Sequence, residues 1–203
     1  RRFCKVMSTD YVPSLLMQGE RRARAESLAV EFQQADAEDL PLADGTFDTV
    51  LSTFGVMFTP NQARVAAELI RVCKPGGKIG LTNWTPSGFI GELFKTIGRY
   101  LPPPPGVASP AAWGTPAFLN QHFGAARVSI ERRVFNFRYQ SAQHWLDVFA
   151  TYYGPTLKAF EALNEADGAA LRDDILTLIA THNRASDGSM IVPSEYLEVV
   201  VTR

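Results

Sequence analysis

Two carboxylates stand at equivalent places in the first part of the chain, each at the end of a short strand-like segment. Asp10 follows the segment 4–9, and Asp36 follows the segment 30–35. Their spacing fits one strand–helix unit, so adjacent parallel strands would place both carboxylates along one rim of a sheet. A carboxylate at such a tip can accept hydrogen bonds from both hydroxyls of a ribose, because two oxygens match two neighbouring donors. The alternative is that each aspartate caps the following helix, and the residues leave both roles open.

The segments that must position these carboxylates alternate between strand and helix. The apolar spacing predicts a helix over 14–25, and the unalternating run 47–54 predicts a strand buried on both faces. A helix over 60–73 follows and is stopped by the Pro-Gly-Gly sequence within 74–77. A fourth strand over 78–82 completes a pattern typical of a parallel α/β sheet, in which ligands bind outside the carboxyl ends of the strands.

Composition excludes several classes of protein. The 203 residues are 46% hydrophobic with a net charge of −1, which favours a globular core and excludes the basic footprint of a dedicated nucleic-acid binder. No stretch approaches the length of a membrane span or a signal peptide, so we expect a soluble, cytoplasmic protein. Cys4 and Cys73 have no metal-ligand spacing, and we expect both to be reduced thiols in the core.

The pattern changes after Trp84. The prolines 102–105 with Gly106 predict a stiff extended segment that cannot lie inside a sheet. The other elements predicted here are a helix over 89–100, a strand over 128–139, helices over 142–153 and 157–183, and a strand over 196–202 that begins after Pro193.

Three segments together resemble the class I S-adenosylmethionine-dependent methyltransferases, and within them the small-molecule group of the ubiquinone and menaquinone biosynthesis enzymes. They are Asp36-Ala37-Glu38-Asp39-Leu40-Pro41-Leu42-Ala43-Asp44-Gly45-Thr46-Phe47-Asp48, then Ser52-Thr53-Phe54-Gly55, then Glu68-Leu69-Ile70-Arg71-Val72-Cys73-Lys74-Pro75-Gly76-Gly77-Lys78. The match runs from about Lys5 to Thr82. It implies a Rossmann-like, mostly parallel sheet with an antiparallel C-terminal strand, S-adenosylmethionine as cofactor, and methyl transfer to a small-molecule acceptor.

The resemblance also implies roles for individual residues. Asp10 would bind the ribose hydroxyls, with Tyr11 and Val12 against the adenine. Asp36 would accept from the adenine amino group, and the amide of Ala37 would donate to a ring nitrogen. Thr53 would lie beside the methionine part, with Phe54 nearby, although simple core packing is the favoured alternative for Phe54 and Phe58.

One part of the family pattern is absent from these residues. The Gly-rich loop after the family's first strand would lie ahead of Arg1, and Gly76-Gly77 is a helix-to-strand turn that cannot replace it. By resemblance, the missing strand would stand between the strand that ends at Asp10 and the one that ends at Thr53. Both strands would then expose unpaired backbone edges, so we expect the chain to be an N-terminally truncated part of a longer protein.

The resemblance predicts one methyltransferase-like domain over 1–203. Its parts would be a cofactor-binding half (1–84), a substrate-side helix, proline loop and strand (85–140), an inserted helical cap (141–187) and a final strand (188–203).

Aromatic residues gather in the second half, where the acceptor would bind. Trp84, Trp145, Tyr152 and Tyr153, with Trp113, suit a flat or apolar acceptor, or else attach the helical cap to the sheet. Methyl transfer from a sulfonium needs orientation and, for oxygen or nitrogen acceptors, a base. Three histidines could serve as that base, with His144 favoured by its aromatic neighbours; they are His122, His144 and His182.

Three other functions remain as alternatives. A non-catalytic methyltransferase-like binding module would be favoured if the Gly-rich loop were truly lacking. A nicotinamide-dependent oxidoreductase shares the sheet, but no Tyr-x-x-x-Lys pair is present. Nucleic-acid methylation lacks both a basic surface and an Asn/Asp-Pro-Pro-Tyr sequence, since Ser52-Thr53-Phe54-Gly55 stands there instead. The residues specify neither a metal site nor an oligomeric state.

Overall fold

A computed structural model describes residues 4–124 and 126–203. The strands are β1 (Val6–Asp10), β2 (Val30–Gln34), β3 (Phe47–Thr53), β4 (Cys73–Trp84), β5 (Arg127–Tyr139) and β6 (Met190–Thr202). The helices are α1 (Pro13–Ala25), α2 (Gln62–Val72), α3 (Phe89–Tyr100), α4 (Pro116–Phe123), α5 (Ala142–Tyr152), α6 (Gly154–Ala162) and α7 (Glu165–His182), with 3₁₀ turns η1 (Val56–Phe58) and η2 (Pro110–Gly114).

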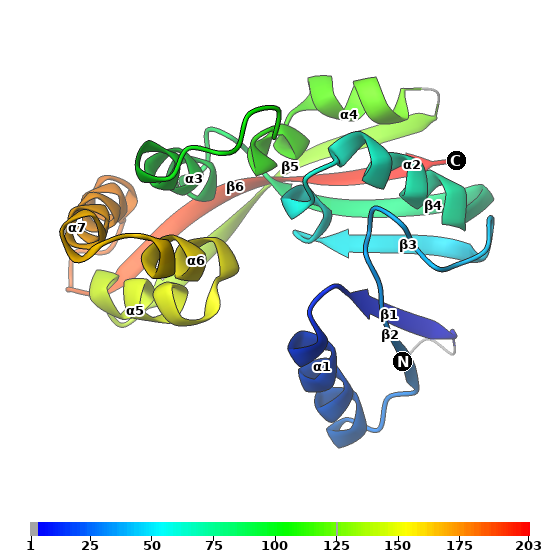
Figure 1. Ribbon diagram of the computed structural model, residues 1–203, viewed down its shortest axis with the longest axis horizontal. Coiled ribbons are helices and arrows are strands. Elements are labelled where there is room, and N and C mark those ends of the chain that lie inside the picture. Colours follow the sequence, from blue (N-terminus) through cyan, green and yellow to red (C-terminus); the bar gives the residue numbers. More distant parts are fainter. Residues whose placement is uncertain (1–3, 125) are drawn as a thin grey trace.

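The strands form two separate sheets. β1 and β2 pair in parallel and carry α1, while the larger sheet has the order β3-β4-β6-β5. In the larger sheet β3 and β4 are parallel, and β6 runs antiparallel to both β4 and β5. Figure 1 shows the β1–α1–β2 unit beside β3, and among the described residues no strand pairs with the outer edge of either β1 or β3.

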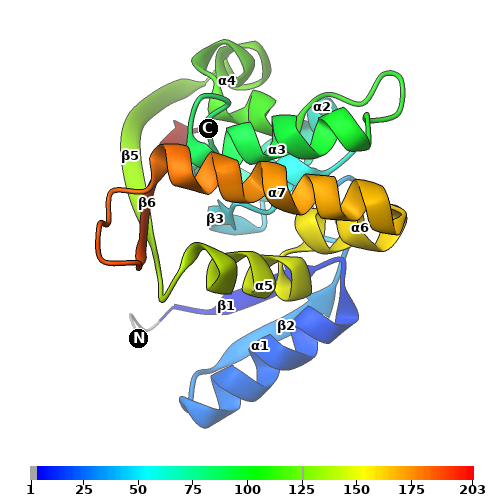
Figure 2. The ribbon, with the colours of Figure 1, turned by 90° about the vertical axis from the view of Figure 1, so that its left-hand side faces the viewer.

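Helices cover β5 and β6 where these strands extend past β4. There α3, α7 and α5 pack together on one side of the two-stranded ribbon, with α7 in contact with both α3 and α5, as Figure 2 shows. Nearer β3, α2 and α4 cover one face of the sheet. The interior is built on large, fully buried side chains from these layers, among them Phe89, Trp113, Phe123, Trp145 and Leu171.

The prediction that 47–54 forms a strand buried on both faces is wrong in its burial. The strand is present as β3, but none of its side chains is fully buried, and Leu51 is 74% exposed. Its side chain lies over Gly80 of β4, where an added Cβ would come within 2.8 Å of it. An apolar strand exposes such a side chain because no described element covers this face of the sheet.

The last strand begins earlier than the sequence predicts. β6 starts at Met190 and includes Pro193, which lies opposite Asn136 of β5. Proline is tolerated at this position because β4 pairs with β6 only from Tyr196 onward. No carbonyl of β4 therefore lies beside Pro193 to accept the hydrogen bond that a proline cannot donate.

The predicted helix over 157–183 is two helices. α6 begins at Gly154 with a proline in its first turn, and α7 begins after Asn164, whose side chain accepts a hydrogen bond from the Asp167 amide at 2.9 Å. Apolar periodicity continues across this break, so the cap residue is the signal that separates the helices.

One of the two thiols differs from the expectation. Both are free, but Cys4 is exposed, so the prediction of a core position is wrong for this residue. It precedes β1, whose outer edge is open. Cys73 is buried at the start of β4, and burial raises the pKa of its thiol.

Trp145 is predicted to be a major contributor to stability. It is fully buried, stacked on Phe149 with ring centroids 3.9 Å apart, and in edge contact with Phe89 and Phe137. We expect Trp145→Ala to lower the free energy of unfolding by about 3–5 kcal/mol, measured by chemical denaturation. Tyr152→Ala is the control: its side chain is 81% exposed, so a comparable loss there would contradict this reasoning.

Candidate functional site

Asp10 and Asp36 adopt the same local structure at the ends of β1 and β2. Oδ1 of Asp10 accepts from the Val12 amide at 2.8 Å, and Oδ1 of Asp36 accepts from the Glu38 amide at 2.8 Å. The N-cap of α1 is Val12, so Asp10 closes a turn ahead of the helix and does not cap it. Within the described chain, Oδ2 of each aspartate has no hydrogen-bond donor.

The parallel pairing of β1 and β2 brings these turns to one rim. Asp10 lies opposite Gln34, the Ala35 amide donates to the carbonyl of Asp10 at 3.1 Å, and Gln34 Nε2 donates to the carbonyl of Tyr11 at 3.1 Å. Four residues predicted to bind the cofactor therefore belong to one cluster: Asp10, Tyr11, Asp36 and Ala37.

Thr53 and Phe54 lie at the end of β3, in the other sheet. Phe54 has φ of +57°, a left-handed conformation that is unusual for a bulky residue, and its amide donates to the carbonyl of Thr82 at 3.0 Å. Its ring stacks on Trp84 at 4.1 Å with an interplanar angle of 12°, and Tyr196 meets it edge-on at 5.5 Å. The predicted residues Phe54 and Trp84 are thus in contact, while Tyr196 was missed.

The segment after Asp36 connects the two rims. Glu38 accepts from the amide of Asn61, just ahead of α2, at 2.6 Å, and Arg64 donates to the Glu38 carbonyl at 2.5 Å. Arg64 also pairs with Asp39 at 3.3 Å. These contacts hold the Asp36 turn against the start of α2, which follows the tip of β3.

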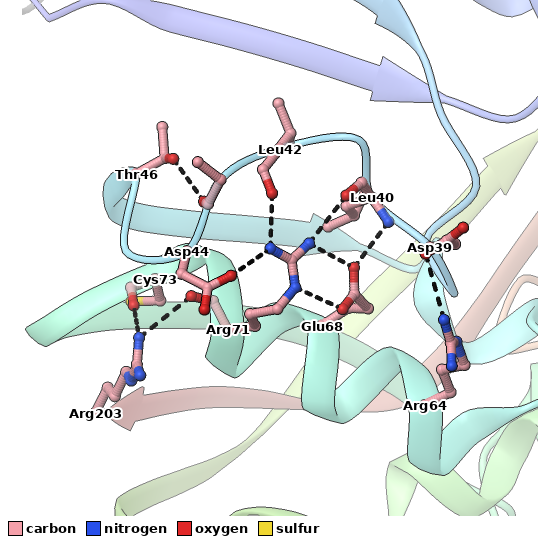
Figure 3. A network of polar contacts seen from close by, with 11 residues as sticks. Asp39, Leu40, Leu42, Asp44, Thr46, Arg64, Glu68, Arg71, Cys73 and Arg203 are labelled. Atoms are coloured by element: carbon pink, nitrogen blue, oxygen red, sulfur yellow. Dashed lines mark hydrogen bonds and ion pairs between the residues drawn. The ribbon is translucent and has the colours of Figure 1, made fainter.

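Arg71 fixes the rest of this segment, as Figure 3 shows. Its guanidinium donates to both carboxylate oxygens of Glu68, to the carbonyls of Leu40 and Leu42, and to Asp44, at 2.6–2.9 Å. Glu68 in turn accepts from the Leu40 amide at 2.8 Å. Hydrogen bonds from Arg71 hold the pKa of the Glu68 carboxyl below its ordinary value. The hydrogen bonds to Glu68 and Asp44 in turn raise the pKa of Arg71.

The remaining aromatic candidates occupy different environments. Trp145 and Trp113 are fully buried, whereas Tyr152 is largely exposed. Tyr153 packs against Phe149 and, edge-on at 6.3 Å, against Phe58 of η1. Their proposed roles toward an acceptor stay predictions.

The three histidines are not brought together. His122 of α4 stacks on Phe118, and His144 of α5 is exposed beside Tyr139. His182 at the end of α7 pairs with Glu92 of α3 at 2.7 Å. The geometry therefore singles out no histidine as a base, and a role for His144 stays a prediction. The described residues contain no cluster of side chains suited to a metal ion, and none of their helices is long and apolar enough to cross a membrane.

Buried polar atoms without partners are a feature that the sequence did not reveal. Within the described chain, both side-chain amide atoms of Asn83, Oγ1 of Thr82 and the hydroxyl of Tyr153 are buried and have no hydrogen-bond partner. Buried polar groups are normally paired, so each such group needs an explanation. Thr82 and Asn83 lie near the end of β4, beside the tip of β3.

The residues present fit the nucleoside part of a cofactor such as S-adenosylmethionine. Each of two neighbouring carboxylates keeps one oxygen without a donor from the described residues, and the Tyr11 ring beside them is exposed. Carboxylate oxygens are suitable acceptors for ribose hydroxyls and an adenine amino group.

Comparisons with known proteins agree with this arrangement. Residues 1–81 match the family model described as a methyltransferase domain. The chain is 38% identical over 195 residues to an uncharacterized protein of Mycobacterium tuberculosis, covering 91% of this chain and 69% of the relative. It is 35% identical over 101 residues to the demethylmenaquinone methyltransferase of Thermus thermophilus, covering 48% and 46%. In fold it is similar to a putative methyltransferase from Bacillus halodurans, with a TM-score of 0.62, 17% identity, and 98% and 83% of the two chains covered.

Strand tips bearing Asp10 and Asp36, the α/β fold and these relatives lead to one conclusion. Residues 1–81 carry a methyltransferase domain, and the chain as a whole has the fold of the class I S-adenosylmethionine-dependent methyltransferases. For such a domain the expected cofactor is S-adenosylmethionine, which would supply a methyl group from its sulfonium when bound.

The Arg71–Glu68 contacts predict a pH-dependent stability. A carboxyl with a depressed pKa in the folded state stabilises the fold above its unfolded pKa, and this contribution is lost as the pH falls through the folded pKa. We therefore expect the unfolding midpoint to fall below about pH 4, where glutamates titrate, and Arg71→Met to reduce this part of the acid sensitivity. Thermal unfolding between about pH 3 and 7 measures it; identical pH profiles for the two proteins would contradict the assignment.

Proposed function

We propose that this protein transfers a methyl group from S-adenosylmethionine to a small-molecule acceptor. The observation that supports S-adenosylmethionine as the methyl donor is the repeated turn at Asp10 and Asp36. This turn leaves a hydrogen-bond acceptor oxygen at each of two adjacent strand tips. By this proposal Asp10 binds the ribose, Asp36 and Ala37 bind the adenine, and Tyr11 lies against the adenine ring.

Support for a small acceptor comes from the rings at the end of β3. Phe54 and Trp84 stack there, with Tyr196 edge-on, so an apolar surface adjoins Thr53, beside which the methionine part would lie. The demethylmenaquinone methyltransferases among the relatives act, by name, on a small molecule. The protein would orient the acceptor toward the methyl group, because displacement at a sulfonium needs alignment above all.

We further propose that a strand outside residues 4–203 completes the cofactor site. β1 and β3 each pair on one side only among the described residues, and Figure 1 shows them facing each other. Unpaired edges of apolar parallel strands are costly, since their N–H and C=O groups lack partners.

Replacing Asp10 tests the cofactor site. Loss of hydrogen bonds from ribose to a charged acceptor should weaken S-adenosylhomocysteine binding by about 10- to 100-fold in Asp10→Ala, measured by isothermal titration calorimetry. Asp173→Asn, an exposed carboxylate on α7, is the matched control and should bind as the wild type does. Equal affinity in the Asp10 variant would reject its assignment.

Chain length tests the additional strand. We expect S-adenosylhomocysteine to bind with micromolar affinity to a chain that includes the sequence encoded ahead of residue 1, and far more weakly to residues 1–203 alone. Equal, stoichiometric binding to both would reject the added strand. Binding to neither would favour a non-catalytic module.

A further inference from the structure

The hydroxyl of Tyr153 is one of the buried polar groups of this region that the fold leaves without a partner among the described residues. Tyr153 lies between α5 and α6, and its hydroxyl oxygen is buried with no hydrogen-bond partner within the described chain. A buried, unpaired hydroxyl destabilises the ligand-free protein, and an apolar ring of the same shape would avoid that cost. A tyrosine at position 153 therefore either lowers stability without benefit or keeps its hydroxyl ready for a hydrogen-bond partner from another molecule.

The surroundings of Tyr153 connect it to the tip of β3. Ring contacts run from Phe54 to Trp84, on to the buried Phe137 and Phe149, and so to Tyr153. Tyr153 then meets Phe58 at 6.3 Å, and Phe58 follows Phe54 by four residues in the sequence. We call these six residues the ring circuit: Phe54, Phe58, Trp84, Phe137, Phe149 and Tyr153.

Within the ring circuit, Tyr153 carries the hydroxyl and Phe58 is the exposed member, at 38%. Burial raises the pKa of Tyr153, so the phenol keeps its proton and acts as a hydrogen-bond donor at neutral pH. The partner that suits it is an oxygen that accepts a hydrogen bond, on a molecule whose remaining surface can lie among aromatic rings.

We propose that the Tyr153 hydroxyl positions the methyl acceptor by donating a hydrogen bond to a carbonyl or hydroxyl oxygen of a flat, otherwise apolar molecule. This inference rests on the proposed function and assigns its acceptor class. The molecule binds beside the exposed Phe58 near the tip of β3, and contact with the buried hydroxyl requires the Phe58 ring to move away from Tyr153. Tyr153 is thus a positioning residue that selects oxygen-bearing acceptors and takes no proton from them.

Two bicyclic probes test this assignment. Coumarin is flat and offers a carbonyl acceptor without a donor, while indole is flat and offers an N–H donor without a carbonyl. We expect the longer chain used in the chain-length test, with S-adenosylhomocysteine present, to bind coumarin more tightly than indole in saturation-transfer NMR titrations. In Tyr153→Phe, coumarin binding should weaken about 3- to 10-fold, as loss of one neutral hydrogen bond implies, with indole unchanged.

A second variant separates positioning from packing. Thr156 of α6 is also buried with a hydroxyl that has no partner in the described chain, so Thr156→Val removes the same kind of group from the same region. Both variants should keep or raise the thermal unfolding midpoint, but Thr156→Val should leave coumarin binding as in the wild type.

The outcomes are distinct. Unchanged coumarin binding in Tyr153→Phe, equal weakening in Thr156→Val, or no preference for coumarin in the wild type would each overturn the assignment. Failure of the proposed function shows separately, as absence of S-adenosylhomocysteine binding in calorimetry of the same samples.

Discussion

The guanidinium of Arg71 holds together parts of the chain that no strand pairing joins. All five of its N–H groups donate, two of them to Glu68 and the others to a segment without regular structure between β2 and β3. That segment leads from the β1–α1–β2 unit to the larger sheet. Because the two sheets share no ladder among the described residues, its conformation determines where the Asp10 and Asp36 turns lie relative to the tip of β3. Lysine could not replace Arg71, since a single ammonium cannot reach acceptors in so many directions.

Local patterns predicted the elements well wherever one signal dominated. The helix over 89–100 has the observed bounds because Gly88 precedes it and apolar residues recur at helical spacing. Burial was harder, as Leu51 shows: an apolar run indicates a strand, but its exposure depends on whether another element covers it. The start of β6 was missed because the tolerance for Pro193 depends on which strands lie beside it.

The residues of the candidate site likewise include some that the sequence predicts and some that it does not. Asp10 and Asp36 could be found from the sequence because each immediately follows a strand, and parallel pairing then brings them to one rim. The contact of Tyr196 with Phe54 and Trp84 could not be found, because it depends on the antiparallel register that sets Trp84 opposite Tyr196, far away in the sequence. Arg71 lay inside a recognisable motif, yet several of its acceptors are backbone carbonyls, which carry no residue signature.

Pro193 has a consequence for how the protein can change over evolution. Since β4 ends its pairing at Tyr196, the outer parts of β5 and β6 leave the sheet as a two-stranded ribbon that joins α5–α7 to the rest of the chain. Insertions or deletions between the two strands lengthen or shorten this appendage without shifting the register of β3 against β4. The helices α5–α7 can therefore diversify while the strand tips that carry Asp10, Asp36 and Thr53 stay constant.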